Sequence, residues 1–160
     1  MNKPAVISQE KLNFIQHDVI PLLEQLDGHA TGHWGVMNGQ QMVEHLVDSV
    51  RNASGKLKLP LANQGEELEK ARAFLLSEKP FRENTKNPLL GPAALPLRRP
   101  GMESALQKLR VELDYFFAVF EEQPQLVTLN PVFGELDYSM NVQLLHKHMK
   151  HHLRQFGLLP

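Results

Sequence analysis

The sequence predicts an all-α fold, a four-helix bundle with a long crossover between its second and third helices. Four segments carry apolar residues at the three- and four-residue spacing of amphipathic helices, whereas strand-like alternation is weak. The breaks between these segments contain proline or glycine, which end helices. The connection after the second segment, residues 55–101, is far longer than a helix–helix turn, as in bundles with one crossover. We expect a single domain over residues 1–160.

The first helix is expected to run from Ser8 to Leu26. Ser8 is a suitable N-cap, and the apolar residues after it recur at helical spacing. Pro21 lies inside this segment and has no backbone N–H to donate to the preceding turn, so it should kink the helix or divide it.

The second helix is expected to begin at Asn38 and to continue to Ser54. Asn38 and Gln41 have the spacing of a capping box, and Gly55 supplies a common stop signal. One face of this helix is mainly apolar and should point to the core. The residues on that face are Met42, His45, Leu46, Ser49, Val50 and Ala53.

The third and fourth helices are expected over residues 102–122 and 136–156. Proline and glycine flank the third helix, and leucine and phenylalanine line its inner face. The fourth helix should end at Gly157, because glycine readily adopts the left-handed conformation common at helix C-termini. Between these two helices, residues 125–129 could form a short extended piece.

The crossover of residues 55–101 divides into two parts. Residues 65–77 could form an additional helix, whereas residues 80–101 contain five prolines and should be irregular. Long connections in compact domains are often functional, so the second part is a candidate wall or lid over a functional site. A surface crossover without a role is the alternative. Four leucines favour docking onto the site or onto a second subunit: Leu89, Leu90, Leu95 and Leu97.

Composition and charge argue against several classes of function. The net charge of −1 and the pI near 6.7 predict no binding to nucleic acid or to an anionic membrane. No apolar run reaches the roughly 18 residues that span a bilayer, and the first residues lack the apolar core of a signal peptide, so we expect a cytoplasmic protein. The chain has no cysteine, so a metal site would have to use imidazole and oxygen ligands.

The fourth helix carries four of the eight histidines. His148 and His152 are one turn apart and share its inward face with apolar residues, and His45 lies on the inward face of the second helix. A single buried histidine is usually a hydrogen-bonded core residue. Three neutral imidazoles that converge would instead suit one metal ion and leave coordination positions open, which is typical of a catalytic site.

Chain topology decides whether these histidines can meet. His45 lies near the start of the second helix, and His148 and His152 lie near the end of the fourth. In a simple up-down-up-down bundle, those regions are at opposite ends. They fall at the same end if the crossover returns the chain along the bundle, so that the third helix runs parallel to the second.

The other polar residues of interest receive weaker predictions. Gln155 could hydrogen-bond a ligand histidine, or it could be an ordinary polar residue near a helix end. His146 should face solvent, and His151 should lie at the edge of the inward face. The remaining histidines are expected on polar or loop surfaces: His17, His29 and His33, the last beside Trp34 at what could be a pocket mouth.

Other chemistries find little support. Ser49 lies near His45 on the inward face, but no acid completes a nucleophilic triad, and the paired Glu-x-x-His motifs of di-iron bundles are missing. The sequence contains no phosphate-binding loop and no dinucleotide fingerprint. Arg98 and Arg99 could meet an anionic group, but a solvated loop is the favoured interpretation.

Two motifs resemble the DinB/YfiT-like superfamily of metal-binding four-helix bundles. They are Gln41-Met-Val-Glu-His45-Leu on the second helix and His148-Met-Lys-His-His152-Leu-Arg-Gln155 on the fourth. Trp34-Gly-Val-Met-Asn38 and Asn130-Pro-Val-Phe-Gly134 are similar to one branch of that superfamily whose activity is unassigned. The resemblance covers residues 8–158. Its members often have histidine where this chain has Asn130, so no role in that loop is carried over.

The resemblance implies an up-down-down-up bundle, frequently a homodimer, that binds one divalent metal, zinc or nickel, through His45, His148 and His152. Characterised members include S-transferases and isomerases that use low-molecular-weight thiols. The leading hypothesis is therefore a metal-dependent thiol S-transferase that acts on a small molecule. The alternatives are a hydrolase that uses metal-bound water and a non-catalytic metal- or small-molecule-binding protein. No catalytic residue beyond the metal ligands is predicted.

Overall fold

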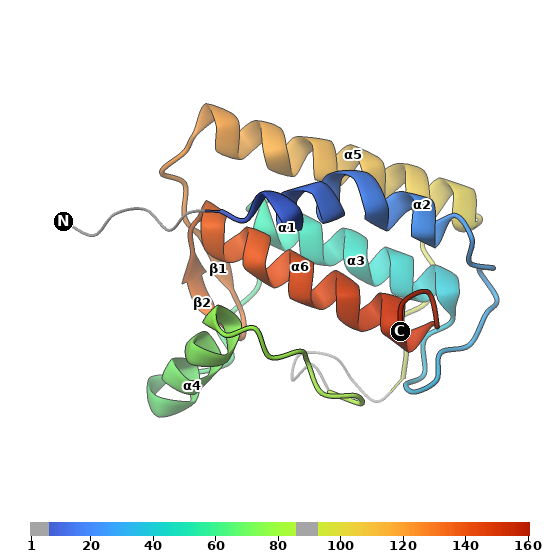
Figure 1. Ribbon diagram of the computed structural model, residues 1–160, viewed down its shortest axis with the longest axis horizontal. Coiled ribbons are helices and arrows are strands. Elements are labelled where there is room, and N and C mark those ends of the chain that lie inside the picture. The colour runs from blue at the N-terminus through green and yellow to red at the C-terminus, as the bar shows by residue number, and fades with distance from the viewer. Residues whose placement is uncertain (1–6, 86–92) are drawn as a thin grey trace.

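The computed structural model describes residues 7–85 and 93–160, so Leu89 and Leu90 lie outside the described residues. The described chain is mostly helical, with one small two-stranded antiparallel sheet (Figure 1). None of its helices combines the length and the apolarity that a bilayer crossing requires. The elements in chain order are α1 (Gln9–Asn13), η1 (Phe14–Asp18), α2 (Val19–Leu23), α3 (Gly39–Ala53), α4 (Gly65–Leu76), α5 (Met102–Glu122), β1 (Thr128–Asn130), β2 (Gly134–Leu136) and α6 (Tyr138–Gln155).

The first helical rod consists of α1, η1 and α2 joined end to end (Figure 1). Its middle section is a π-turn, in which Val19 N–H donates to the carbonyl of Phe14. Pro21 lies in α2, three residues after this section ends, and its ring cannot fit against the carbonyl four residues earlier in a regular helix. The predicted interruption is therefore present as a widened turn, and the helix ends at Leu23, short of the expected Leu26.

The second and third predicted helices are present with almost the expected bounds. In α3, Asn38 accepts from the Gln41 N–H, and the Gln41 side chain accepts from the Asn38 N–H, so the capping box is complete. Gly55 follows with φ of +89°, a conformation that favours glycine at the end of a helix. Helix α5 spans residues 102–122, as the flanking proline and glycine predict.

The predicted start of the last helix is wrong. Residues 134–136 form β2, which pairs with β1 over residues 128–130, and α6 begins after Asp137, whose side chain accepts from Met140 N–H. Leu136 continues the apolar spacing of the helix, but Asp137 provides the stronger start signal because it satisfies a free N–H of the first turn. The Asn130 side chain closes the hairpin by accepting from the backbone N–H groups of two residues that follow it.

The long helices lie side by side (Figure 1). Helix α3 packs against α5 and α6, and the first rod also contacts both. The colours in Figure 1 show that α3 and α5 begin at one end of the molecule, whereas the first rod and α6 begin at the other. Their facing sides form the main apolar core, which includes Ile15, Val19, Leu23, Met42, Leu46, Val50, Leu109, Phe116, Leu145, Met149 and Leu153.

Helix α4 forms, as expected, in the first part of the crossover and lies outside the long helices (Figure 1). It packs on the hairpin and on the outer side of α6, where it completes a second, separate apolar cluster. Arg72 of α4 donates to two backbone carbonyls of the hairpin, Phe133 and Glu135. The buried members of the second cluster are Leu75, Phe133, Leu136 and Leu144.

Candidate metal centre

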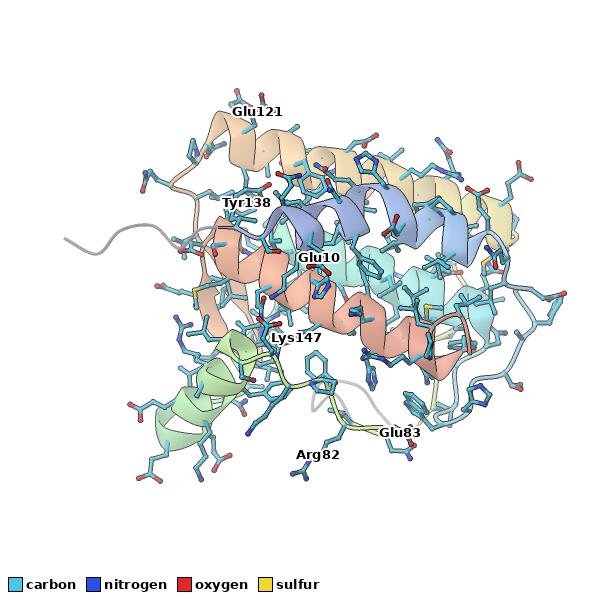
Figure 2. All side chains as sticks on the ribbon, viewed as in Figure 1. Glu10, Arg82, Glu83, Glu121, Tyr138 and Lys147 are labelled. Atoms are coloured by element: carbon cyan, nitrogen blue, oxygen red, sulfur yellow. The ribbon has the colours of Figure 1, made fainter. Side chains whose placement is uncertain are left out.

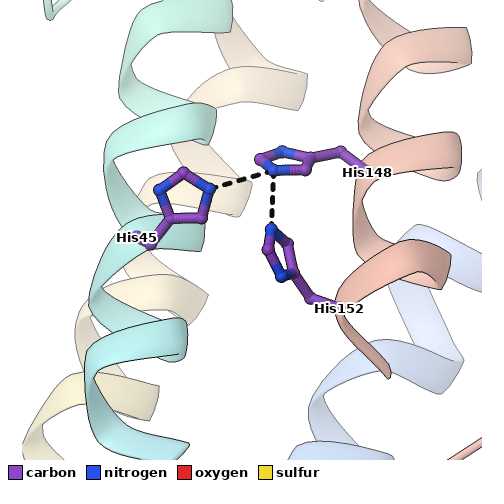
Figure 3. Close-up of side chains that lie close together, drawn as sticks. All are labelled: His45, His148 and His152. Carbon is purple, nitrogen blue, oxygen red and sulfur yellow. Dashed lines mark hydrogen bonds between the residues drawn. The ribbon is translucent and has the colours of Figure 1, made fainter. Parts of the chain in front are cut away.

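Three histidine rings converge between α3 and α6 (Figure 3). His148 Nε2 lies 3.0 Å from His45 Nε2 and 2.9 Å from His152 Nε2. One nitrogen from each ring lies within 4.8 Å of the others, so the group could hold a metal ion. The sequence predicts this trio, and the structure brings all three residues together although 103 positions separate His45 from His148.

The spacing of the nitrogens suits a small divalent ion. Bonds of about 2.0–2.1 Å at tetrahedral angles would place ligand nitrogens about 3.3 Å apart. The two separations from His148 are close to that value, and the His45–His152 pair lies within 4.8 Å, so small side-chain movements would bring the three nitrogens around one ion. Hydrogen bonds among the three rings satisfy their nitrogens less well than a shared metal ion would. A ring nitrogen carries either one hydrogen or one lone pair in the ring plane, so His148 Nε2 cannot make two well-aligned bonds to both neighbours. The residues present therefore fit a metal.

The surroundings keep the three rings in the neutral form that binds metals. Burial lowers the pKa of His45 to about 4, although the nearby Asp48 carboxylate acts in the opposite direction. Burial, followed by the neighbouring imidazoles, lowers the pKa of His148 well below its usual range, and burial also does so for His152. Neutral imidazoles need not lose a proton before they coordinate an ion, so the site is ready to bind at neutral pH.

Gln155 fixes the orientation of His152. Its Oε1 lies 2.7 Å from His152 Nδ1, so that ring nitrogen carries the proton and Nε2 presents a lone pair to the centre. The Gln155 Nε2 donates to the carbonyl of Trp34 at 2.8 Å, and the side chain is buried. Gln155 therefore contacts both a candidate ligand and the loop between α2 and α3.

That loop is shaped around Gln155. The His33 N–H donates to the Gln155 carbonyl at 2.7 Å, whereas the His33 side chain remains exposed. Glycines bring the backbone close: a Cβ on Gly32 would lie 2.9 Å from Gln155 Cγ, and one on Gly35 would lie 2.7 Å from Gln155 Nε2. The loop and the end of α6 thus form one hydrogen-bonded unit beside the centre.

His151 is more central than its predicted place at the edge of the inward face. It is only 7% exposed, and its ring centre lies 5.4 Å from that of Trp34 and 5.7 Å from that of Phe81. Burial and Arg154 lower its pKa, and a hydrogen bond with the Phe81 backbone offsets part of that shift. His151 does not belong to the metal-ligand group, but it lies beside it, with its ring centre 5.0 Å from that of His152.

The prediction for His146 is wrong. It was expected in solvent, but the ring of Phe14 packs edge-on against it at 5.3 Å, and burial lowers its pKa to about 4. The spacing of residues along α6 cannot reveal this contact, because the ring that covers His146 comes from the first rod. His17 and His29 are exposed, as expected.

Arg98 lies in an exposed irregular segment, as predicted, with a side chain that is 48% exposed, but it also meets an anionic group. Its guanidinium makes two hydrogen bonds to the Asp48 carboxylate, at 3.0 and 2.9 Å, and its backbone N–H donates to Glu44 Oε1 at 2.7 Å. Sequence reasoning missed the buried Glu44; its only visible signal is the four-residue spacing from Asp48 on α3. Leu95 and Leu97 nearby are 51% and 46% exposed, so they do not cover the centre.

Ser49 is not part of a nucleophilic site. Its hydroxyl donates to the carbonyl of His45 one turn earlier, which is a common arrangement for serine inside a helix. Comparisons with protein-family models, with curated proteins and with solved structures found no match for this chain. The function therefore has to be argued from the centre itself.

Proposed function

We propose that this protein is a metal-dependent enzyme of the DinB/YfiT-like type, in which His45, His148 and His152 hold one zinc or nickel ion. The observation that carries the proposal is the convergence of three neutral imidazole nitrogens within 4.8 Å. The hydrogen bond that His152 Nδ1–H donates to Gln155 Oε1 supports it, because ligating histidines usually have their second nitrogen fixed by such a partner.

The proposed architecture is an up-down-down-up four-helix bundle. Two observations support it: α3 and α5 begin at the same end of the molecule, and the start of α3 lies beside the end of α6 (Figure 1). The helical core gives the centre a rigid frame, since His45 and His152 project from two helices that also pack against each other.

The proposed reaction joins a low-molecular-weight thiol to an electrophilic carbon of a small-molecule substrate: the S–H bond breaks, a new C–S bond forms, and the group displaced from that carbon leaves with its electron pair and the thiol proton. A divalent ion in this centre would supply a Lewis acid that lowers the pKa of a bound thiol or water. Among the described residues, no carboxylate belongs to the three-histidine group. Two aromatic rings lie close by: Phe81 contacts His148, and Trp34 contacts the adjacent His151. These aromatic rings support the thiol reaction, because they offer an apolar surface to a thiol substrate. A hydrolase that uses metal-bound water is the alternative, with His151, a buried imidazole beside His152, as the candidate general base.

A non-catalytic metal- or small-molecule-binding protein is the second candidate. The small exposed area of His152, 6%, favours it, because a closely covered ion has little room for a substrate. Binding of an added thiol to the metal-loaded protein separates the two candidates. We further propose that the protein is cytoplasmic and that it is a homodimer. Light scattering of the purified protein would test the homodimer.

The test of the metal centre is elemental analysis of protein purified without a histidine tag. We expect one equivalent of divalent metal per chain in the wild type and none in His148→Ala or His152→Ala. His146→Ala is the matched control, because this histidine lies on the same helix outside the trio, and it should retain the metal. Full occupancy in the His148→Ala/His152→Ala double variant would overturn the proposal. Thiol transferase assays on the loaded protein would then test the reaction.

A further inference from the structure

A row of polar side chains on α6 holds the chain segment that follows α4. Gln143, Lys147 and His151 are four residues apart, so they lie in line along the helix, next to the face that carries the trio. The Gln143 side chain donates to the carbonyls of Leu75 and Ser77, at 3.1 and 3.0 Å. This amide therefore anchors the end of α4.

Lys147 anchors the next part of the segment. Its ammonium group donates to the carbonyls of Phe74 and Lys79, at 2.7 and 2.6 Å, and it also lies over the Phe74 ring. The residue is only 6% exposed. A buried ammonium group needs such partners to offset its lost hydration, so the positions of these carbonyls are well determined. Figure 2 shows Lys147 extending from α6 toward α4, with Arg82 and Glu83 farther along the segment.

The anchored segment brings Phe81 to the centre. The Phe81 ring centre lies 6.1 Å from that of His148 and 5.7 Å from that of His151. On its other sides the ring contacts Phe74 at 5.2 Å and Phe133 at 6.4 Å. These ring-to-ring distances are those of direct aromatic contact, so no ligand group fits between Phe81 and His148.

We propose that Phe81 is a specificity-determining wall of the three-histidine centre, held by Gln143 and Lys147, that excludes bulky ligands from the His148 side. The proposal rests on the proposed metal function for the identity of those ligands. The geometry of the wall itself can be tested without metal. The proposal predicts that a small thiol binds the centre without displacing the ring, whereas a large aromatic thiol needs the volume that the Phe81 ring fills.

The first test measures the access of a reagent to single histidines in metal-free protein. Diethyl pyrocarbonate modifies neutral imidazoles, and mass spectrometry identifies the residue. We expect Phe81→Ala to accelerate the modification of His148. Phe14→Ala is the matched control, since it removes a ring at similar distance from His146 and should accelerate only that residue. An unchanged His148 rate in folded Phe81→Ala would overturn the proposal, whether or not the protein binds metal. If Phe81→Ala does not fold, Phe81→Leu gives the same comparison.

The second test measures ligand size on cobalt-loaded protein by visible absorption. In Phe81→Ala the affinity for naphthalenethiol should rise by about tenfold or more, because the clash with the wall is relieved, whereas the affinity for mercaptoethanol should not change. Lys147→Met keeps the ring but removes its anchor, so it should give a smaller gain. Loss of naphthalenethiol affinity, or no gain, would refute the size-exclusion role. Failure of the wild type to bind any metal would instead refute the proposed function.

Discussion

Replacing Gly35 by alanine tests whether the loop between α2 and α3 controls the metal centre. Gly35 has φ of +79°, and an added Cβ would lie 2.7 Å from Gln155 Nε2. Gly65 is the matched control, because it has φ of +56° but no atom within 4 Å of an added Cβ. Both substitutions impose a left-handed conformation on alanine, but only the first displaces Gln155.

The expected magnitudes follow from these contacts. The left-handed backbone costs about 1–2 kcal/mol in either variant. The end of the Gln155 side chain can move, but only by giving up its hydrogen bonds to the Trp34 carbonyl and to His152 Nδ1. Each such bond contributes about 1 kcal/mol, so Gly35→Ala should lose about 3–4 kcal/mol of unfolding free energy in total. Loss of the contact that orients a ligand histidine should also weaken metal binding by about 10–100-fold.

The assay has two parts, urea unfolding of the metal-free proteins and competitive zinc titration against a chromogenic chelator at pH 7.5. We expect Gly65→Ala to bind zinc like the wild type and Gly35→Ala to bind it at least about tenfold more weakly. Equal zinc affinities for the two folded variants would show that Gln155 does not position His152. If the wild type does not bind zinc, the assignment of the metal site itself is wrong, whatever the role of Gln155.

Three further outcomes are expected. Removal of the metal with a chelator should lower the melting temperature, because the protein loses the stabilisation that comes from metal binding; this is about 2.7 kcal/mol if the free ion had been at a hundred times its dissociation constant. The far-ultraviolet helical signal should remain intact at 25 °C, because the apolar core does not depend on the ion, and loss of helicity would contradict this. Burial raises the pKa of Glu112, but the amines of Lys108 and Lys56 lower it more, so its net pKa is depressed. Its stabilisation should be complete above the unfolded pKa near 4.5 and should be lost as the pH falls through the lower folded pKa. Glu112→Gln should therefore cost about 1–3 kcal/mol in urea unfolding at pH 7 and progressively less as the pH falls below 4.5, and a cost independent of pH would be inconsistent with the ion pairs. Arg98→Met should lower the free energy of unfolding by only about 0–1 kcal/mol, because its partner Asp48 is near the surface. It should nevertheless speed amide exchange in the irregular segment around residue 98; unchanged exchange would mean that the ion pair does not hold this segment in place.

The trio was predictable because each histidine lies on the inward face of an amphipathic helix, where apolar neighbours mark its direction. The end of α3 and both ends of α5 were predictable because proline and glycine mark helix boundaries locally. The extended piece expected over residues 125–129 overlaps β1 at residues 128 and 129, but the pairing with β2 was not predictable, because the strands have only three residues each and Leu136 continues the spacing of the helix that follows.

The anchoring of the Phe81 segment was beyond sequence reasoning for a different reason. Gln143 and Lys147 bind backbone carbonyls, which every residue carries, so the partner segment leaves no compositional signal. Phe81 likewise sits in an irregular stretch with no periodicity to orient its ring. His146 was misplaced because its cover, Phe14, comes from another helix. Local patterns reveal which face of a helix is inward but not which distant side chain covers an outer position.

The small size of the second apolar cluster affects how quickly the three-histidine centre would release a bound ion or ligand. Within the described part of the chain, the second cluster, which attaches α4 and the following segment, has four buried members and five partly buried ones, together with a few side-chain hydrogen bonds. Regions held by so few buried contacts open locally at a free energy well below that of global unfolding. Opening of this unit would withdraw Phe81 while the trio on α3 and α6 stays assembled. The lifetime of a bound ion or ligand is then governed by a sub-global opening equilibrium, and substitutions in Leu75 or Leu144 should shorten it without changing the ligands themselves.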